Sequence, residues 1–123
     1  MFDLTPEEAR LLLNVALMAT GGNRFQSAEK IFAVLEAFRP DSPSVAVGKA
    51  IALISAQRFA DCVDYVDAVA LRKFPESAML KAFKGMALLR LERVPEANET
   101  LAEAAAQTDD PAAAQLAKGL MND

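Results

Sequence analysis

Apolar residues recur along this chain at intervals of three and four positions, and strand-like alternation is nowhere sustained. This spacing places apolar side chains along one face of an α-helix and predicts an all-α protein. Short segments rich in Gly, Pro and polar residues separate the apolar runs, so neighbouring helices should pack antiparallel. The predicted helices span residues 6–20, 26–38, 43–56, 60–73, 75–91, 95–108 and 111–121.

Three similar turns recur between these helices. Arg24, Arg58 and Arg93 are each followed by an apolar residue, with a small residue three positions further on. The turns are 34 and then 35 residues apart. Two more series follow the same period: the prolines Pro40, Pro75 and Pro111, and the small residues Ala16, Ala50, Gly85 and Gly119. A period of this length is typical of solenoids, in which each hairpin buries its apolar face against the next.

The period predicts one domain, residues 1–123, built as a solenoid. Three helical hairpins would occupy residues 9–42, 43–77 and 78–111, and a capping helix would occupy residues 111–121. Ala28-x-x-x-Phe32 followed by Pro40 resembles the second helix of the tetratricopeptide repeat (TPR), and this resemblance implies a TPR-like solenoid. Lys49 and Lys84 stand where that repeat has Leu. Either their stems reach out of an interface, or the register of the first helices is off by one.

The composition disfavours catalysis, metal binding and nucleic-acid binding. The chain has no histidine and one cysteine, Cys62, which we interpret as a core residue. Its carboxylates lie at helix starts or on polar helix faces, so we expect no enzyme, cofactor or metal. The formal net charge is -4, and the basic residues form no stripe that could follow a phosphate backbone. No run of 18 apolar residues occurs and the N-terminus is not basic, so we expect a cytoplasmic protein that does not insert into membranes.

The first helix of each TPR hairpin lines the concave face of the stack, which identifies the candidate partner-binding residues. They are Leu13, Leu17, Val47, Ile51, Ile54, Met79, Phe83, Met86 and Leu89. An aliphatic face with methionines suits an amphipathic helix better than a charged peptide terminus. The alternative is that these residues are ordinary core.

Three segments give a closer resemblance over nearly the whole chain: residues 11–21, residues 28–36 and the ending from residue 108 to residue 121. They resemble the small TPR-like chaperones of bacterial type III secretion that hold the needle subunit. The resemblance implies a cytoplasmic, virulence-associated bacterial chaperone that occupies the subunit's C-terminal helix and prevents premature polymerisation. It also implies a second small helical co-chaperone.

Other interpretations remain open. The chain would also suit a TPR adaptor, a self-associating scaffold, or a chaperone for another secreted protein. A homodimer is possible when the chain is alone.

Overall fold

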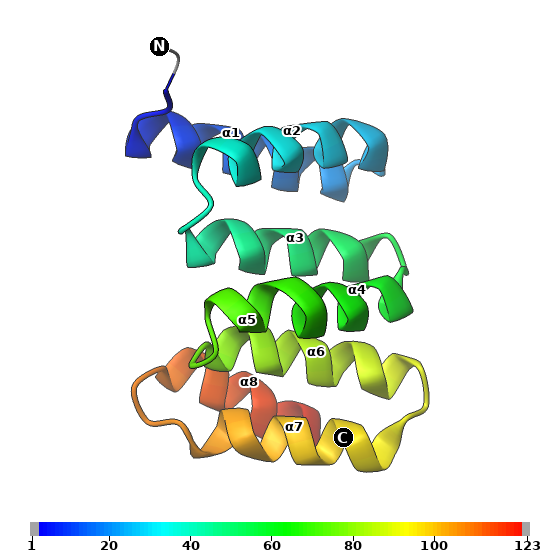
Figure 1. The fold of residues 1–123 in the computed structure, drawn as a ribbon. Helices are drawn as coiled ribbons and strands as arrows, with labels where there is room; N and C mark the ends of the chain where they lie inside the picture. The colour runs from blue at the N-terminus through cyan, green and yellow to red at the C-terminus, as the bar shows by residue number, and fades with distance from the viewer. Residues whose placement is uncertain (1–2, 122–123) are drawn as a thin grey trace. The chain divides into compact units, whose positions relative to one another are not determined.

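The computed structural model describes residues 3–121, which form an all-α structure with no strand in that range (Figure 1). The helices are α1 (Pro6–Gly21), α2 (Phe25–Phe38), α3 (Pro43–Ser55), α4 (Phe59–Tyr65), the π-helix η1 (Val66–Ala70), α5 (Leu71–Lys73), α6 (Ala78–Arg90), α7 (Val94–Ala106) and α8 (Pro111–Met121). The segments α4, η1 and α5 follow one another without a break and correspond to the predicted helix 60–73. The predicted fold class is confirmed.

Most helix ends fall within two residues of their predicted positions, but the start of α6 does not. The sequence predicted a helix from Pro75, whereas α6 begins at Ala78. Ser77 is the N-cap: its side-chain oxygen accepts a hydrogen bond from the backbone N–H of Leu80 at 3.2 Å. Because a capping hydroxyl satisfies an otherwise unpaired N–H, it fixes the start of the helix more strongly than the proline does.

The start of α1 follows its sequence signature. The side-chain oxygen of Thr5 accepts from the backbone N–H of Glu8 at 3.1 Å, and Glu8 Oε1 accepts from the backbone N–H of Thr5 at 3.0 Å. This reciprocal capping box satisfies two backbone donors. The hydrogen bonds from Thr5 also lower the pKa of Glu8 below its usual value.

The three turns predicted from the arginine series share one backbone geometry. Each contains a residue in the left-handed region; these are Asn23, Gln57 and Glu92, with φ angles of 63°, 60° and 62°. The N–H of Arg24 donates to the carbonyl of Ala19 at 2.7 Å. The N–H of Arg93 likewise donates to the carbonyl of Leu88 at 2.9 Å. Both are the long bond of a Schellman motif, which ends a helix and reverses the chain. The repeat is therefore visible in backbone geometry as well as in sequence.

The contacts within the chain divide it into two compact units at the turn between Gln57 and Arg58. We call them the N-terminal unit and the C-terminal unit. The boundary lies inside the second predicted repeat, and the single domain expected from the sequence stays a prediction. In a repeat architecture each hairpin contacts only its neighbours, so such a division is natural.

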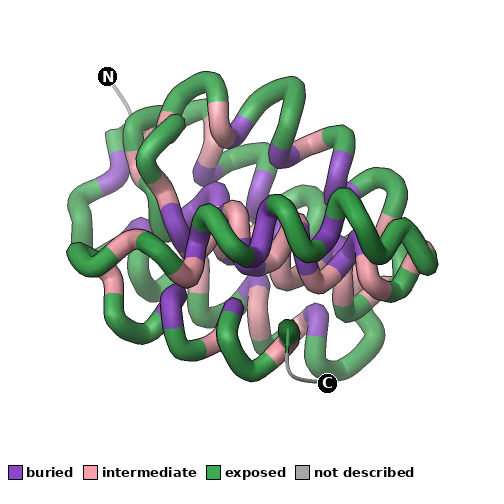
Figure 2. Tube along the Cα trace, turned by 90° about the horizontal axis from the view of Figure 1, so that it is seen from below, coloured by how far each residue is buried: buried purple, intermediate pink, exposed green. Residues whose placement is uncertain are grey.

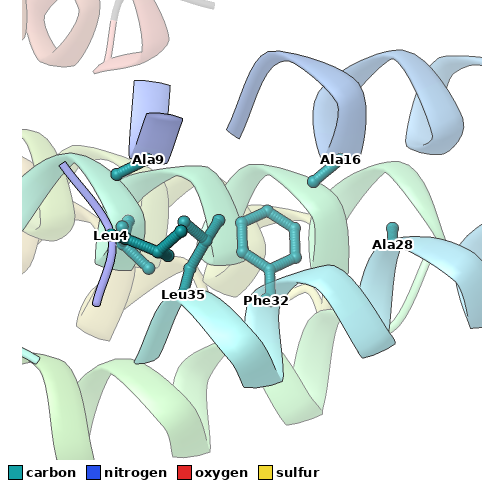
Figure 3. Close-up of a cluster of buried hydrophobic side chains, with 7 residues drawn as sticks. Leu4, Ala9, Ala16, Ala28, Phe32 and Leu35 are labelled. Carbon is teal, nitrogen blue, oxygen red and sulfur yellow. The ribbon is translucent and has the colours of Figure 1, made fainter. Parts of the chain in front are cut away.

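The N-terminal unit packs α1, α2 and α3 around one apolar cluster. Its buried members are Leu4, Ala9, Ala16, Ala28, Phe32, Leu35 and Val45. Figure 3 shows the side chains of Phe32 and Leu35 rising from α2 toward Ala16 and Ala9 of α1. Small residues on α1 let the large side chains of α2 fill the space between the helices.

The C-terminal unit packs α6 against α4 and η1 on one side and against α7 and α8 on another. The cluster formed by α6, α7 and α8 contains Ala78, Ala82, Leu101, Ala104, Ala113 and Ala117. Gly85 is buried, as expected from the small-residue series. Gly119, the last of that series, is instead exposed, with open space where a Cβ would stand. Its place in the series is therefore not a packing position.

The π-helix explains why the repeat period changes from 34 to 35. The buried side chains of the second helix in each repeat include one pair at equivalent positions; the pairs are Phe32 and Leu35, Val66 and Ala70, and Leu101 and Ala104. The pairs in α2 and α7 are three residues apart, whereas the pair at the ends of η1 is four apart. A π-turn absorbs one additional residue without breaking the helix. The extra residue thus lies between Val66 and Ala70.

Candidate functional site

The candidate partner-binding residues share one degree of burial. All nine are half-buried, neither part of the fully buried core nor freely exposed. Figure 2 shows that buried, intermediate and exposed positions alternate along the helices. Because half-buried apolar side chains have one side packed and one side in water, burial alone does not separate a binding face from a core edge.

In the N-terminal unit, two of the candidates lie on α1. Leu13 and Leu17 pack against the apolar cluster of this unit. Leu13 also reaches α3, because its Cδ1 atom lies 2.7 Å from the position that a Cβ on Gly48 would take. Leu13 therefore contributes to the contact between α1 and α3, and the packing of both leucines against the cluster favours the alternative that they are core residues.

The other candidates of this unit form a stripe along α3. Val47, Ile51 and Ile54 follow the i, i+4, i+7 spacing of one helix face, and all three are half-buried. The fully buried Ala50 and the buried Leu53 lie on other faces of α3. The stripe is aliphatic throughout, with the exposed Ser44 one turn before it.

A pocket opens between α1 and α3 near the start of this stripe. Its lining includes Arg10, Leu13, Ser44 and Val45, together with Arg39. Arg39, directly after α2, connects to the segment before α1: its guanidinium donates to the carbonyl oxygen of Leu4 at 3.4 Å. The face thus combines an aliphatic stripe with cationic groups at one end.

In the C-terminal unit the candidates divide into two sets. Met79, Phe83 and Met86 follow i, i+4, i+7 spacing on one face of α6. Met79 and Leu89, however, pack against the cluster that includes Ala113 and Ala117 of α8. The last helix therefore already covers part of the candidate surface on α6. Phe83 and Met86 are the candidates here that do not pack against this cluster.

The two unexpected lysines each form an ion pair with the second helix of the preceding hairpin. Lys49 Nζ lies 2.8 Å from Glu36 Oε1 on α2, and Lys84 Nζ lies 2.7 Å from Asp67 Oδ1 in η1. Each lysine directly precedes a buried small residue of the repeat series. The stems run along a helix interface while the ammonium groups reach a carboxylate at its edge. These ion pairs favour the alternative in which the lysine stems reach out of an interface.

Cys62, the one thiol of the sequence, is fully buried. Burial raises its pKa to about 12, so the thiol is protonated near neutral pH. Among residues 3–121 no cluster of three or more His, Cys, Asp and Glu side chains could hold a metal ion. In the same range, no helix has the length and apolar character needed to cross a bilayer.

Comparison with known proteins adds no family assignment. No protein-family model matches the chain, and no curated protein is significantly similar to it in sequence.

The most exposed apolar surface of the N-terminal unit lies outside the predicted site. Leu11, Val15 and Met18 on α1 are 65%, 44% and 76% exposed. Sequence reasoning missed them because runs of apolar residues on α1 give it an apolar circumference too wide to show which side is buried. The 34-residue period does indicate that this face of α1 is suited to packing. Leu11 is equivalent in the repeat to Val45, and Val45 is buried in the apolar cluster.

Proposed function

We propose that this chain is a non-enzymatic cytoplasmic chaperone that binds an amphipathic helix of a secreted subunit. The client is the C-terminal helix of a type III secretion needle subunit, which would otherwise polymerise. Occupying the apolar face of that helix hides it from other copies of the subunit. The family resemblance in the sequence supports this client, and a second small helical co-chaperone would accompany the complex.

The observation that carries the proposal is the stripe of Val47, Ile51 and Ile54. It presents three aliphatic side chains in a row, each partly in water, on a helix whose other faces are already packed. On α6, Phe83 and Met86 are likewise apolar and half-buried. Aliphatic and methionine side chains adapt to a helical ligand without requiring a charged partner.

Co-expression tests the client. The chain is produced together with the small helical proteins encoded beside its gene, and the material that co-purifies is identified by mass spectrometry. Capture of a small subunit that forms polymers when alone supports the chaperone. A chain that captures no such subunit, and leaves the polymerisation of the neighbouring subunits unchanged, contradicts it. A general adaptor or scaffold, the second candidate, would show that behaviour.

Charge insertion tests the site. Ile51→Asp and Met86→Asp should each weaken binding of the captured subunit's C-terminal peptide at least a hundredfold, because the carboxylate would be buried without a partner. Matched controls place the same charge on exposed helix positions, Ala33→Asp on α2 and Ala102→Asp on α7. Isothermal titration measures the affinities, and circular dichroism checks the folding of each variant. Full binding by folded Ile51→Asp and Met86→Asp would exclude both the stripe on α3 and the surface of Phe83 and Met86 on α6.

A further inference from the structure

The stripe of Leu11, Val15 and Met18 occupies one face of α1, and we call it the α1 outer face. The three residues follow i, i+4, i+7 spacing, so they lie in a row. They are the apolar side chains of α1 with the greatest exposure, whereas Ala9 and Ala16 on the opposite side are buried. A row of large apolar side chains this exposed is a feature of interaction surfaces.

The sequence repeat shows what such a face does elsewhere in the chain. The equivalents of Leu11, Val15 and Met18 are Val45, Lys49 and Ala52 on α3, and Leu80, Lys84 and Ala87 on α6. Val45 belongs to the cluster formed with α1 and α2, and Leu80 and Ala87 are fully buried on α6, which packs against α4 and η1. In both units this face of the first helix therefore receives the preceding helices.

The two lysines confirm the direction of that contact. Lys49 reaches Glu36 on α2, and Lys84 reaches Asp67 in η1, so each points to the second helix of the preceding repeat. Val15 stands at the equivalent position of α1. The α1 outer face thus has the geometry of a repeat interface, with a valine in place of a lysine.

The second helix of the hairpin, α2, adds an exposed apolar residue on the side of the α1 outer face. Glu36 marks the flank of α2 that faces α3. Val34, two residues earlier, lies roughly 200° around the helix and is 41% exposed. It therefore points away from α3, to the side that also carries the α1 outer face.

The charges around the α1 outer face are opposite at its two ends. Glu7, exposed, lies four residues before Leu11 on the same row. Arg24, also exposed, lies in the turn at the other end of α1. In the other two turns the equivalent arginines bind an acidic residue three positions later, in the pairs Arg58–Asp61 and Arg93–Glu96. The residue three positions after Arg24 is Ser27, which offers no carboxylate.

We propose that a second copy of this chain docks on the α1 outer face, with the two α1 helices antiparallel about a two-fold axis near Val15. Such an isologous contact pairs the apolar row with itself. Glu7 lies eight residues before Val15, roughly 12 Å along the helix axis; Gly21, the last residue of α1, lies six residues after Val15, roughly 9 Å along the axis, and Arg24 lies in the turn that follows it. The antiparallel arrangement therefore places Glu7 of each copy beside Arg24 of the other, twice in the dimer. This surface is separate from the stripe of Val47, Ile51 and Ile54 that carries the proposed function.

Sedimentation equilibrium of the full chain tests the contact. The free protein should dimerise, and Val15→Asp should raise the dimer dissociation constant at least about tenfold, because two carboxylates would meet at the axis. Ala33→Asp, an exposed position on α2 on a different flank from Val34, is the control and should leave the constant unchanged. A chain that is monomeric throughout the concentration series overturns the proposal. So does a dimer that resists Val15→Asp but dissociates with Ile51→Asp, because it would use the stripe on α3.

Charge reversal tests the two-fold symmetry. Glu7→Lys alone and Arg24→Glu alone should each weaken the dimer, because like charges then meet at both contacts. An equimolar mixture of the two variants should restore it: in the mixed dimer Lys at position 7 faces Glu at position 24, and Glu7 of the second variant faces Arg24 of the first. A mixture no tighter than the separate variants overturns the antiparallel arrangement. Client capture by Val15→Asp should persist, which separates this proposal from the proposed function.

Discussion

The side chain of Leu101 on α7 fills the space that a Cβ on Gly85 of α6 would need. The Cγ atom of this leucine lies 2.5 Å from the ideal Cβ position, and Leu101 is fully buried. Gly85→Ala should therefore lower the free energy of unfolding by roughly 1–3 kcal/mol through overpacking. This loss outweighs the gain of up to about 1 kcal/mol from the better helix propensity of alanine. Urea denaturation measures the change.

Gly119→Ala is the matched control. Gly119 is also helical, but nothing lies within 4 Å of its ideal Cβ position. The same substitution there should raise the free energy of unfolding by about 0.5–1 kcal/mol, because only the helix propensity changes. A stabilising Gly85→Ala would contradict the close contact between α6 and α7.

Glycine substitutions at the left-handed turn residues and within a helix should change the stability of the protein in opposite directions. Gln57 and Glu92 adopt φ angles of 60° and 62°, which strain a residue with a Cβ. Gln57→Gly and Glu92→Gly should each stabilise the protein by about 0.5–1 kcal/mol. Glu99→Gly, on the exposed face of α7, should instead destabilise it by about 1 kcal/mol. Thermal unfolding would show melting temperatures moving in opposite directions, and a fall for all three variants would mean that the turn geometry is wrong.

Two substitutions of the half-buried Lys84 separate the contribution of its aliphatic stem to stability from the contribution of its charge. Lys84 is 21% exposed and its partner Asp67 is 49% exposed, so solvent screens the ion pair. Lys84→Met keeps the stem and should change the free energy of unfolding by less than about 1 kcal/mol. Lys84→Ala also removes buried methylenes and should cost about 1–2 kcal/mol. Equal losses in the two variants would show that the charge, rather than the stem, stabilises α6 against η1.

Local signals in the sequence were sufficient for most of the fold. The capping box at Thr5 and Glu8 and the arginine turns each depend on a few adjacent residues, and the structure places them as expected. The change of period from 34 to 35 was visible as well, but its cause was not. The additional residue is absorbed by η1 within a helix, and no glycine or proline marks the place.

Sequence reasoning was weaker on which helix faces are covered, because that depends on contacts between distant segments. Met79 and Leu89 matched a concave face by spacing, yet both pack against the cluster completed by α8. Leu11 and Met18 were not among the candidate residues, yet within residues 3–121 they are the most exposed of the large apolar side chains. A helix with apolar residues on several faces carries no local mark of the face that its neighbours cover.

The thiol of Cys62 should be inert in the folded protein. Its pKa rises from 9.0 to about 12 because burial penalises the thiolate. At pH 8 the thiolate fraction is then about a thousandfold lower than in the unfolded chain, so iodoacetamide should label Cys62 at a measurable rate only after unfolding in urea. Because the folded pKa lies above the unfolded one, the stabilisation is complete below pH 9 and is lost as pH rises from about 9 toward 12. Cys62→Ala should therefore lose less stability than the parent between pH 8 and pH 10 in urea titrations. Rapid labelling of the folded protein at pH 8, or identical pH dependence in the two proteins, would show that Cys62 is not buried as described.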